Sequence, residues 1–340
     1  MANARISMHL PPCIDPSRAP LAFGSRALPQ LTEQLGDPEP VTRRRVLAAL
    51  CDLVHDPEKA LEAINTGCLE KLKALLQDED STVRVKTTEL LYLLGTYNLG
   101  RGAVLKHDVI ALLSNMLDEP VDACRKNVHQ ALELLAQFPA GADSILSLGL
   151  VPRLVMKLSE EQQEIQAYIL ATLSSCTWVD ALPALSSNGV SVLRDLLSHP
   201  STSIRRAATR AMVAMSVPAE GKVKVCDEDV LPVLVELLSD GDPGVKANAA
   251  GTIMNTAVIT AGKVQALKAG AITPLLTLVD STDTAVCANA LRALTTLAEV
   301  PSARLQLLEH VSSLERLLNH PASIISRAAA TAVRVITWKP

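Results

Sequence analysis

The chain has 340 residues, of which 48% are hydrophobic but only 2% are aromatic. Leu, Val, Ile and Ala must therefore build the core, and closely packed helices suit these residues better than a sheet sandwich does. The formal net charge of −4 argues against a general nucleic-acid binder, which needs a clustered basic face.

The first 26 residues contain four prolines and little hydrophobic periodicity, so we expect residues 1–26 to form an extended N-terminal arm. This segment lacks the apolar run of a signal peptide, and no stretch of the chain is apolar over the length of a membrane span. The seven cysteines include no C-x-x-C pair, which argues against a disulfide framework and a zinc knuckle. Together these features predict a soluble intracellular protein.

A regular pattern begins at Leu28, and each of its units contains a large aliphatic residue, here called the anchor, at the end of a first helix. The anchors, 39 or 41 residues apart, are Leu35, Leu76, Leu117, Leu158, Leu197, Leu238, Val279 and Leu318. The residues fifteen positions after the anchors are all large and apolar: Leu50, Leu91, Leu132, Leu173, Met212, Ile253, Leu294 and Val333. A column this uniform indicates a true internal repeat.

Each unit is predicted to contain a helix, a polar loop, a long second helix and a short third helix. Asp, Ser and Thr in the loops are expected to cap the long helices. Four glycines near the ends of short segments are expected to adopt the left-handed conformation: Gly67, Gly149, Gly189 and Gly270. The period fits both armadillo and HEAT repeats, and the glycine-terminated third helix favours armadillo. The predicted fold is all-α, a right-handed α-α superhelix (armadillo/HEAT-like solenoid) of about eight repeats over residues 27–340.

No constellation of residues indicates an active site. The histidines form no H-E-x-x-H motif, and the Gly-Lys pairs at 221–222 and 262–263 lack the first glycine of a phosphate-binding loop. We therefore expect no enzyme, no cofactor, no metal and no small-molecule substrate. His199 and His320 are interpreted as turn residues, Trp178 as filling a gap between helices, and the arginines at 43–45 and 205–206 as solvated helix faces.

The surface of the long second helices is the remaining candidate for function, since these helices line the concave side of an armadillo solenoid. The candidate protein-binding residues on this surface are Arg45, Lys86, Asn127, Tyr168, Arg210, Asn248, Asn255, Asn289 and Arg292. Nuclear-import adaptors place Trp and Asn thirteen and seventeen positions after the anchor. Here only Asn255 keeps the asparagine and the tryptophan is absent throughout, which argues against recognition of import signals. The asparagines and basic residues could instead clasp a peptide main chain.

The overall layout resembles one family. The segment "DPSRAPLAFGSRALPQLTEQLGD" leads directly into the first repeat, and eight near-regular repeats end at "VRVITWKP". This arrangement resembles the armadillo-repeat radial-spoke proteins of motile cilia and flagella, the radial spoke head 14 family. The resemblance implies a non-enzymatic subunit of the axonemal radial spoke, with other radial-spoke or axonemal proteins as partners and no nucleic acid or membrane. It supplies no functional residues.

Two functional hypotheses follow. The first is a scaffold of the cilium or flagellum axoneme, within the cytoskeleton, that holds neighbouring spoke proteins and supports motility. The alternative is a soluble armadillo adaptor that binds a linear peptide or cargo in its concave groove, for transport or complex assembly.

Overall fold

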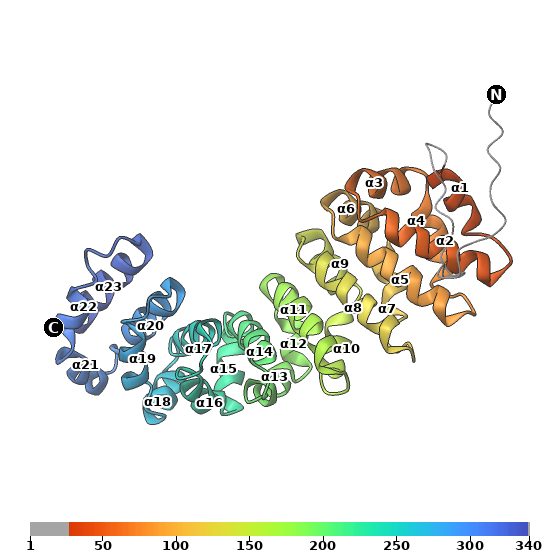
Figure 1. Ribbon diagram of the computed structural model, residues 1–340. Coiled ribbons are helices and arrows are strands. Elements are labelled where there is room, and N and C mark those ends of the chain that lie inside the picture. Colours follow the sequence, from red (N-terminus) through yellow and green to blue (C-terminus); the bar gives the residue numbers. More distant parts are fainter. Residues whose placement is uncertain (1–26, 339–340) are drawn as a thin grey trace. The chain divides into compact units, whose positions relative to one another are not determined.

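The structure, a computed structural model, describes residues 27–338, so the expected N-terminal arm lies outside the described residues. Every regular element in this part of the chain is an α-helix (Figure 1). The chain divides into two compact units, one ending at Gly141 and the other beginning at Ala142. The expected extent of the solenoid, residues 27–340, stays a prediction.

Eight long helices of 14 to 17 residues recur through the described residues. They are α2 (Pro40–Leu53), α5 (Ser81–Gly95), α8 (Asp122–Ala136), α11 (Gln163–Val179), α14 (Thr202–Met215), α17 (Pro243–Thr256), α20 (Thr284–Leu297) and α23 (Ser323–Ile336). The short helix before α2 is α1 (Ala27–Gln34). Pairs of short helices separate the long ones: α3 (Pro57–Asn65), α4 (Cys68–Leu75), α6 (Asn98–Lys106), α7 (Val109–Ser114), α9 (Pro139–Ser147), α10 (Leu150–Lys157), α12 (Leu182–Ser186), α13 (Gly189–Leu197), α15 (Ala219–Asp227), α16 (Val230–Leu237), α18 (Thr260–Lys268), α19 (Ile272–Leu278), α21 (Pro301–Leu308) and α22 (Val311–Glu315). The expected order of short, long and short helix is confirmed in the first seven repeats, while the described part of the eighth repeat contains only α22 and α23.

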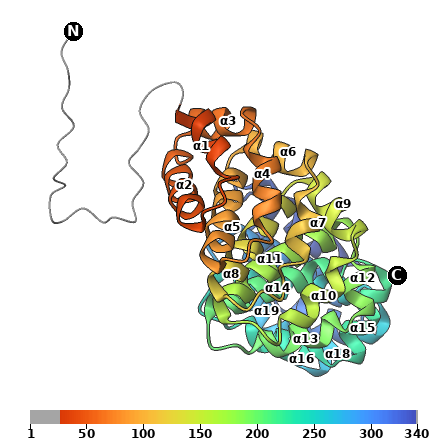
Figure 2. The same cartoon turned by 90° about the vertical axis from the view of Figure 1, so that its right-hand side faces the viewer.

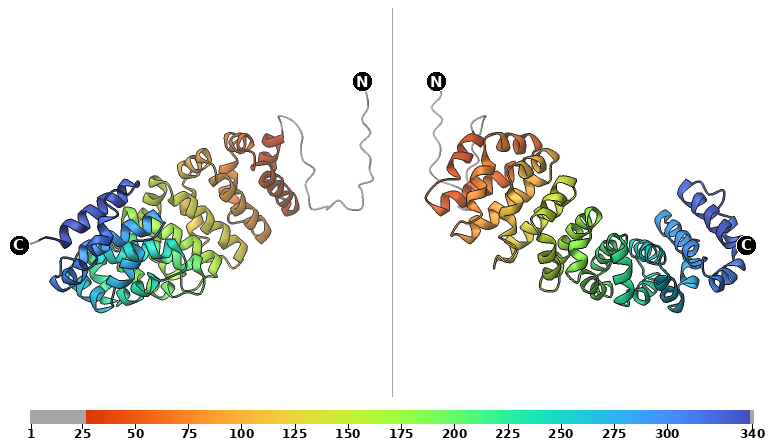
Figure 3. Two further views of the ribbon diagram at one scale, coloured as in Figure 1. Left: turned by 60° about the vertical axis from the view of Figure 1, so that its left-hand side comes forward. Right: turned by 180° about the vertical axis from the view of Figure 1, so that it is seen from behind.

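The long helices of neighbouring repeats pack side by side. In the first unit, α5 lies between α2 and α8 (Figure 2). In the second unit, α11, α14, α17, α20 and α23 follow one another in the same way, as the colour order in Figure 3 shows. A single repeat cannot bury its apolar face alone, so each layer depends on its neighbours for stability.

The predicted columns form the core. Seven of the eight residues fifteen positions after the anchors are at most 1% exposed, and seven of the eight anchors are at most 3% exposed. Both exceptions are in the last repeat, where Val333 is half-buried and Leu318 is 39% exposed. Among the long helices described, α23 packs only against α20, so its far side has no neighbour to cover it.

Aspartates cap several long helices, as expected. Asp80, Asp242 and Asp283 each accept one or two backbone N–H groups of the following turn at 2.9–3.1 Å. These bonds satisfy N–H groups that have no partner inside the helix.

Three of the four predicted left-handed glycines are confirmed, with φ of 81° at Gly67, 64° at Gly149 and 78° at Gly270. The prediction is wrong at Gly189, because the preceding Asn188 takes the left-handed turn with φ of 59°. Gly189 is needed for space instead, since a Cβ there would lie 2.6 Å from a backbone carbonyl oxygen. Asn tolerates the left-handed region better than most residues, which lets it replace glycine in the turn.

A second set of glycines marks the corner where four of the long helices pass into the next short helix. Gly100, Gly141, Gly221 and Gly262 are each the third residue of a short helix. A Cβ at any of the four would lie 1.7–2.2 Å from a carbonyl oxygen in the last turn of the long helix. The glycines of the two Gly-Lys pairs thus permit close helix packing.

Two expectations about single residues have opposite outcomes. His199 and His320 are turn residues, since the Nδ1 of each accepts a hydrogen bond from the backbone N–H two residues later at 3.1 Å. The expectation for Trp178 is wrong, because this side chain is 57% exposed at the C-terminal end of α11 and fills no gap.

Candidate functional site

The nine predicted binding residues all lie on long helices. Arg45, Lys86 and Asn127 belong to α2, α5 and α8 of the first unit. The second unit holds the other six, on α11, α14, α17 and α20: Tyr168, Arg210, Asn248, Asn255, Asn289 and Arg292. The predicted residues thus fall into two sets, one in each unit.

The four asparagines contact the preceding repeat. The Nδ2 of Asn127 donates to the carbonyl oxygen of Val85 at 3.1 Å, and that of Asn289 donates to the carbonyl oxygen of Ala247 at 2.9 Å. Asn248 and Asn255 each donate to a hydroxyl and a carbonyl oxygen of α14 or the residue following it, at 3.0–3.4 Å. The amide nitrogens therefore hold adjacent long helices in register, and Oδ1 is the atom that each side chain can offer to the N–H of a partner.

The basic residues differ in how much charge they present. Lys86 is paired with Glu89 at 2.7 Å, and although burial alone would lower its pKa, the hydrogen bond to Glu89 raises it. Arg45, Arg210 and Arg292 are exposed and form no ion pair with any residue in 27–338. The three arginines, unlike Lys86, are available to an anionic partner.

Tyr168 lies half-buried on α11. Its backbone carbonyl accepts the Thr172 hydroxyl at 2.9 Å.

An arginine ladder at the loops is the feature that sequence reasoning missed. The Nη1 of Arg84 donates to the carbonyl oxygen of Asp78 in its own repeat at 2.7 Å, and Nη2 contacts Glu119 of the next repeat at 2.6 Å. The hydrogen bond to Glu119 raises the pKa of Arg84. Arg43 repeats the arrangement with Asp78 at 2.8 Å, and its side chain is only 14% exposed.

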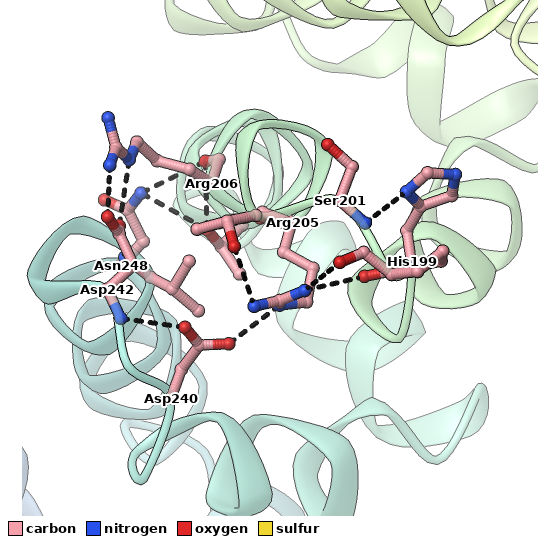
Figure 4. Close-up of polar contacts among 11 residues, drawn as sticks. His199, Ser201, Arg205, Arg206, Asp240, Asp242 and Asn248 are labelled. Carbon is pink, nitrogen blue, oxygen red and sulfur yellow. Dashed lines mark hydrogen bonds and ion pairs between the residues drawn. The ribbon is translucent and has the colours of Figure 1, made fainter.

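Arg205 extends the same pattern into the second unit. It donates to the carbonyl oxygen of His199 at 2.8 Å and to Asp240 of the next repeat at 2.7 Å (Figure 4). The interpretation of the basic runs as solvated faces is therefore wrong for Arg43 and Arg205, which connect neighbouring loops. The sequence pattern that indicates this ion pair is a basic residue eight positions after one anchor and an acidic residue two positions after the next anchor.

Arg206 makes a second connection beside Arg205. It pairs with Asp242, which at the same time caps α17 by accepting the N–H of Val245 at 3.0 Å (Figure 4). The guanidinium of Arg206 holds the pKa of Asp242 below its ordinary value. Two adjacent arginines of α14 are thus both neutralised by the loop before α17.

Reactive chemistry is weakly represented in the described residues. No group of three or more His, Cys, Asp or Glu side chains within residues 27–338 is placed to hold a metal ion. Burial raises the pKa of the thiols of Cys51, Cys68 and Cys176 to about 12. A thiol with so high a pKa is a poor nucleophile at neutral pH.

Family models match two overlapping stretches: HEAT repeats match residues 190–274, and the armadillo/beta-catenin-like repeat matches residues 260–299. The fold is that of an armadillo/HEAT-like solenoid. Solved structures agree with this fold. A crystal structure of an engineered protein matches with a TM-score of 0.72 and 21% identity, covering 92% of this chain and 89% of that one. A designed armadillo repeat protein in complex with the peptide (KR)4 matches with a TM-score of 0.61 and 20% identity, covering 67% of this chain and 99% of that one.

A curated relative carries information beyond the fold. Radial spoke protein 14 of Chlamydomonas reinhardtii is 25% identical over 229 residues, which is 62% of this chain and 58% of the relative. The expected resemblance to the armadillo-repeat radial-spoke proteins is confirmed. Among the described helices of this repeat protein, none is both long enough and apolar enough to cross a bilayer.

Proposed function

We propose that the chain is a non-enzymatic scaffold subunit of the axonemal radial spoke. In this role its solenoid surfaces hold neighbouring spoke proteins and support ciliary or flagellar motility. The observation that carries the proposal is the match to Radial spoke protein 14, which extends over 229 residues. The proposed location is the axoneme of the cilium or flagellum.

The contacts between repeats support a scaffold role. A structural subunit in a moving assembly must keep its binding surfaces in fixed register. The arginine ladder joins the loops of adjacent repeats, as in the contacts of Arg84 with Glu119 and Arg205 with Asp240. The asparagines join adjacent long helices near their middle. Two lines of polar contacts along the stack resist sliding of one layer over the next, while apolar burial supplies most of the stability.

Localisation and extraction in ciliated cells test this proposal. The full chain carrying a fluorescent tag should lie along axonemes and remain with tubulin after the membrane is removed with detergent. The free tag serves as the control and should be extracted completely. Expression of the tagged chain should restore beating in cells that lack their own copy. The proposal is contradicted if the tagged chain is extracted completely by detergent or is found only in the nucleus.

A second candidate function is a soluble adaptor that binds a linear peptide. The exposed, unpaired Arg210 and Arg292 on long helices of one unit favour it. Reversing both charges to Glu should then abolish peptide capture without changing the thermal unfolding of the chain. If capture survives this change but is lost when residues 1–26 are deleted, the groove is not the binding site.

A further inference from the structure

Acidic and basic residues are unevenly distributed among the long helices, although the net charge of the chain is small. The four consecutive long helices α14, α17, α20 and α23 contain no Asp and no Glu. They contain seven basic residues, which are Arg205, Arg206, Arg210, Lys246, Arg292, Arg327 and Arg334. The first unit differs, because each of α2, α5 and α8 carries at least one carboxylate. A chain with a net charge of −4 thus has one purely cationic stack of helices.

Five of these cations have no ion pair among the described residues, and four of the five, Arg210, Arg292, Arg327 and Arg334, are exposed. Arg205 and Arg206 are neutralised by loop aspartates. Arg210, Arg292 and Arg327 are exposed, and none of the three has a carboxylate partner among the described residues. Solvent-exposed arginines without partners keep a full charge and can donate two parallel hydrogen bonds to a carboxylate.

A groove in the second unit brings two of the free arginines together. Arg292 of α20 and Arg327 of α23 both line a depression of about 650 Å³. The other lining residues are Met254, Thr295, Thr296, Ser323, Ile324, Ala328 and Thr331. This lining combines two guanidiniums, several hydroxyls and apolar side chains, and it includes no carboxylate. Such a groove suits an acidic side chain together with an adjoining apolar one.

Another free arginine, Arg210, lies further along the same stack. Arg210 and Arg292 occupy the same position, thirteen residues after the anchor, in α14 and α20. The intervening helix α17 has the buried Gly251 at this position, and a Cβ there would lie 3.3 Å from the Nδ2 of Asn289, so glycine leaves room for that amide between the layers. Packed helices are spaced by about 8–10 Å, which places the two arginines roughly 16–20 Å apart. An extended chain covers this distance with roughly five or six residues.

The platform under this surface is held rigid before any partner binds. Asn248 of α17 donates its amide to α14, and Asn289 of α20 donates its amide to α17. These bonds fix the spacing between layers and so reduce the ordering that binding requires. The Oδ1 atoms of the two asparagines lie on the same column and can accept N–H groups from an extended main chain.

We propose that the face formed by α14, α17, α20 and α23 binds an extended segment of a partner protein in which Asp or Glu residues recur five or six positions apart. One carboxylate binds between Arg292 and Arg327, and another binds at Arg210. The inference rests on the proposed scaffold role, to which it adds the chemical class of one partner. It concerns the second unit alone and requires no contribution from the first.

Fluorescence anisotropy with the purified full chain tests the proposal. The probe is a labelled 14-residue peptide with Glu at every fifth or sixth position in a Gly/Ser/Leu background. Three comparison probes are the same peptide with Gln for Glu, the same peptide with Lys for Glu, and a 14-nucleotide oligo-dT. The Glu peptide should bind best, and its affinity should fall as salt rises because exposed charges are screened.

Paired variants locate the binding face. The double variant Arg292→Gln and Arg327→Gln should weaken binding of the Glu peptide at least tenfold. The control variant Lys268→Gln and Arg316→Gln removes two exposed charges of the same unit outside the groove and should change the affinity less than twofold. Thermal unfolding of both variants should match that of the wild type, since all four side chains are exposed.

Four results would overturn the inference: no measurable binding of the Glu peptide, equal binding of the Gln peptide, equal losses in both double variants, or tighter binding of oligo-dT. The last result would assign the face to nucleic acid. The assay uses no ciliary material, so its failure is separable from failure of the proposed axonemal location.

Discussion

Two glycines of helix α6 are predicted to respond in opposite directions to the same substitution. A Cβ at Gly100 would lie 1.9 Å from the carbonyl oxygen of Leu94, whereas a Cβ at Gly102 would meet nothing within 4 Å. Both residues lie within Asn98–Lys106. Comparing alanine substitutions at these two glycines therefore distinguishes the effect of close helix packing from the ordinary destabilisation by glycine within a helix.

The magnitudes follow from the geometry. Relief of the contact at Gly100→Ala requires the chain to move by about 1 Å, and overpacking of this kind costs about 1–3 kcal/mol. Gly102→Ala should stabilise the helix by about 0.5–1 kcal/mol, because alanine loses less backbone entropy than glycine. The two variants should thus differ by about 1.5–4 kcal/mol although each adds one methyl group.

Hydrogen exchange followed by mass spectrometry is the suitable assay, because unfolding of a repeat array need not be two-state. Gly100→Ala should accelerate exchange in α5 and α6 by about 5- to 150-fold, and Gly102→Ala should slow exchange in α6. Equal protection in the two variants, or stabilisation by Gly100→Ala, would refute the role assigned to the glycines at the helix corners.

Three further predictions concern the cap, the core and the thiols. Asp242→Asn should destabilise α17 at pH 7. Because Arg206 lowers the pKa of Asp242 in the folded chain, the stabilisation by the carboxylate is lost on protonation, and the difference from the wild type should vanish as the pH falls below 3.8. Urea unfolding of both proteins across this pH range measures the difference. Ile253→Ala should cost about 2–5 kcal/mol, but Val333→Ala in the same column of the half-covered last repeat should cost clearly less, as chemical denaturation can measure. Burial raises the pKa of Cys51 to about 12, so peptide mapping at pH 8 should find this thiol unlabelled by iodoacetamide in the native chain and labelled in urea.

Most of the fold can be predicted from the sequence because the same hydrophobic pattern occurs in every repeat. The column containing Leu132 and Ile253 identifies the buried face of each long helix, and both residues are 0% exposed. The polar loops likewise predict caps such as Asp80. These features depend on residues close together in the sequence, and each repeat provides an independent example of the same pattern.

The contacts between repeats are harder to predict, because they depend on how one helix is placed against the next. To predict the hydrogen bond from Asn289 to the carbonyl oxygen of Ala247, one must know which faces of α17 and α20 pack together. The ion pair of Arg205 with Asp240 has a readable spacing, but a run of two arginines also fits a solvated face. The exposure of Trp178 was unpredictable for a related reason, since an aromatic residue near a helix end fits a core or a surface equally well.

Cross-linking mass spectrometry on intact, demembranated axonemes tests the central claim most directly. If the chain is a radial-spoke scaffold, its lysines should form cross-links to identified radial-spoke subunits in axonemes, and these should disappear from axonemes that lack spokes. The claim is contradicted if cross-links among known spoke subunits are abundant while this chain forms none to them.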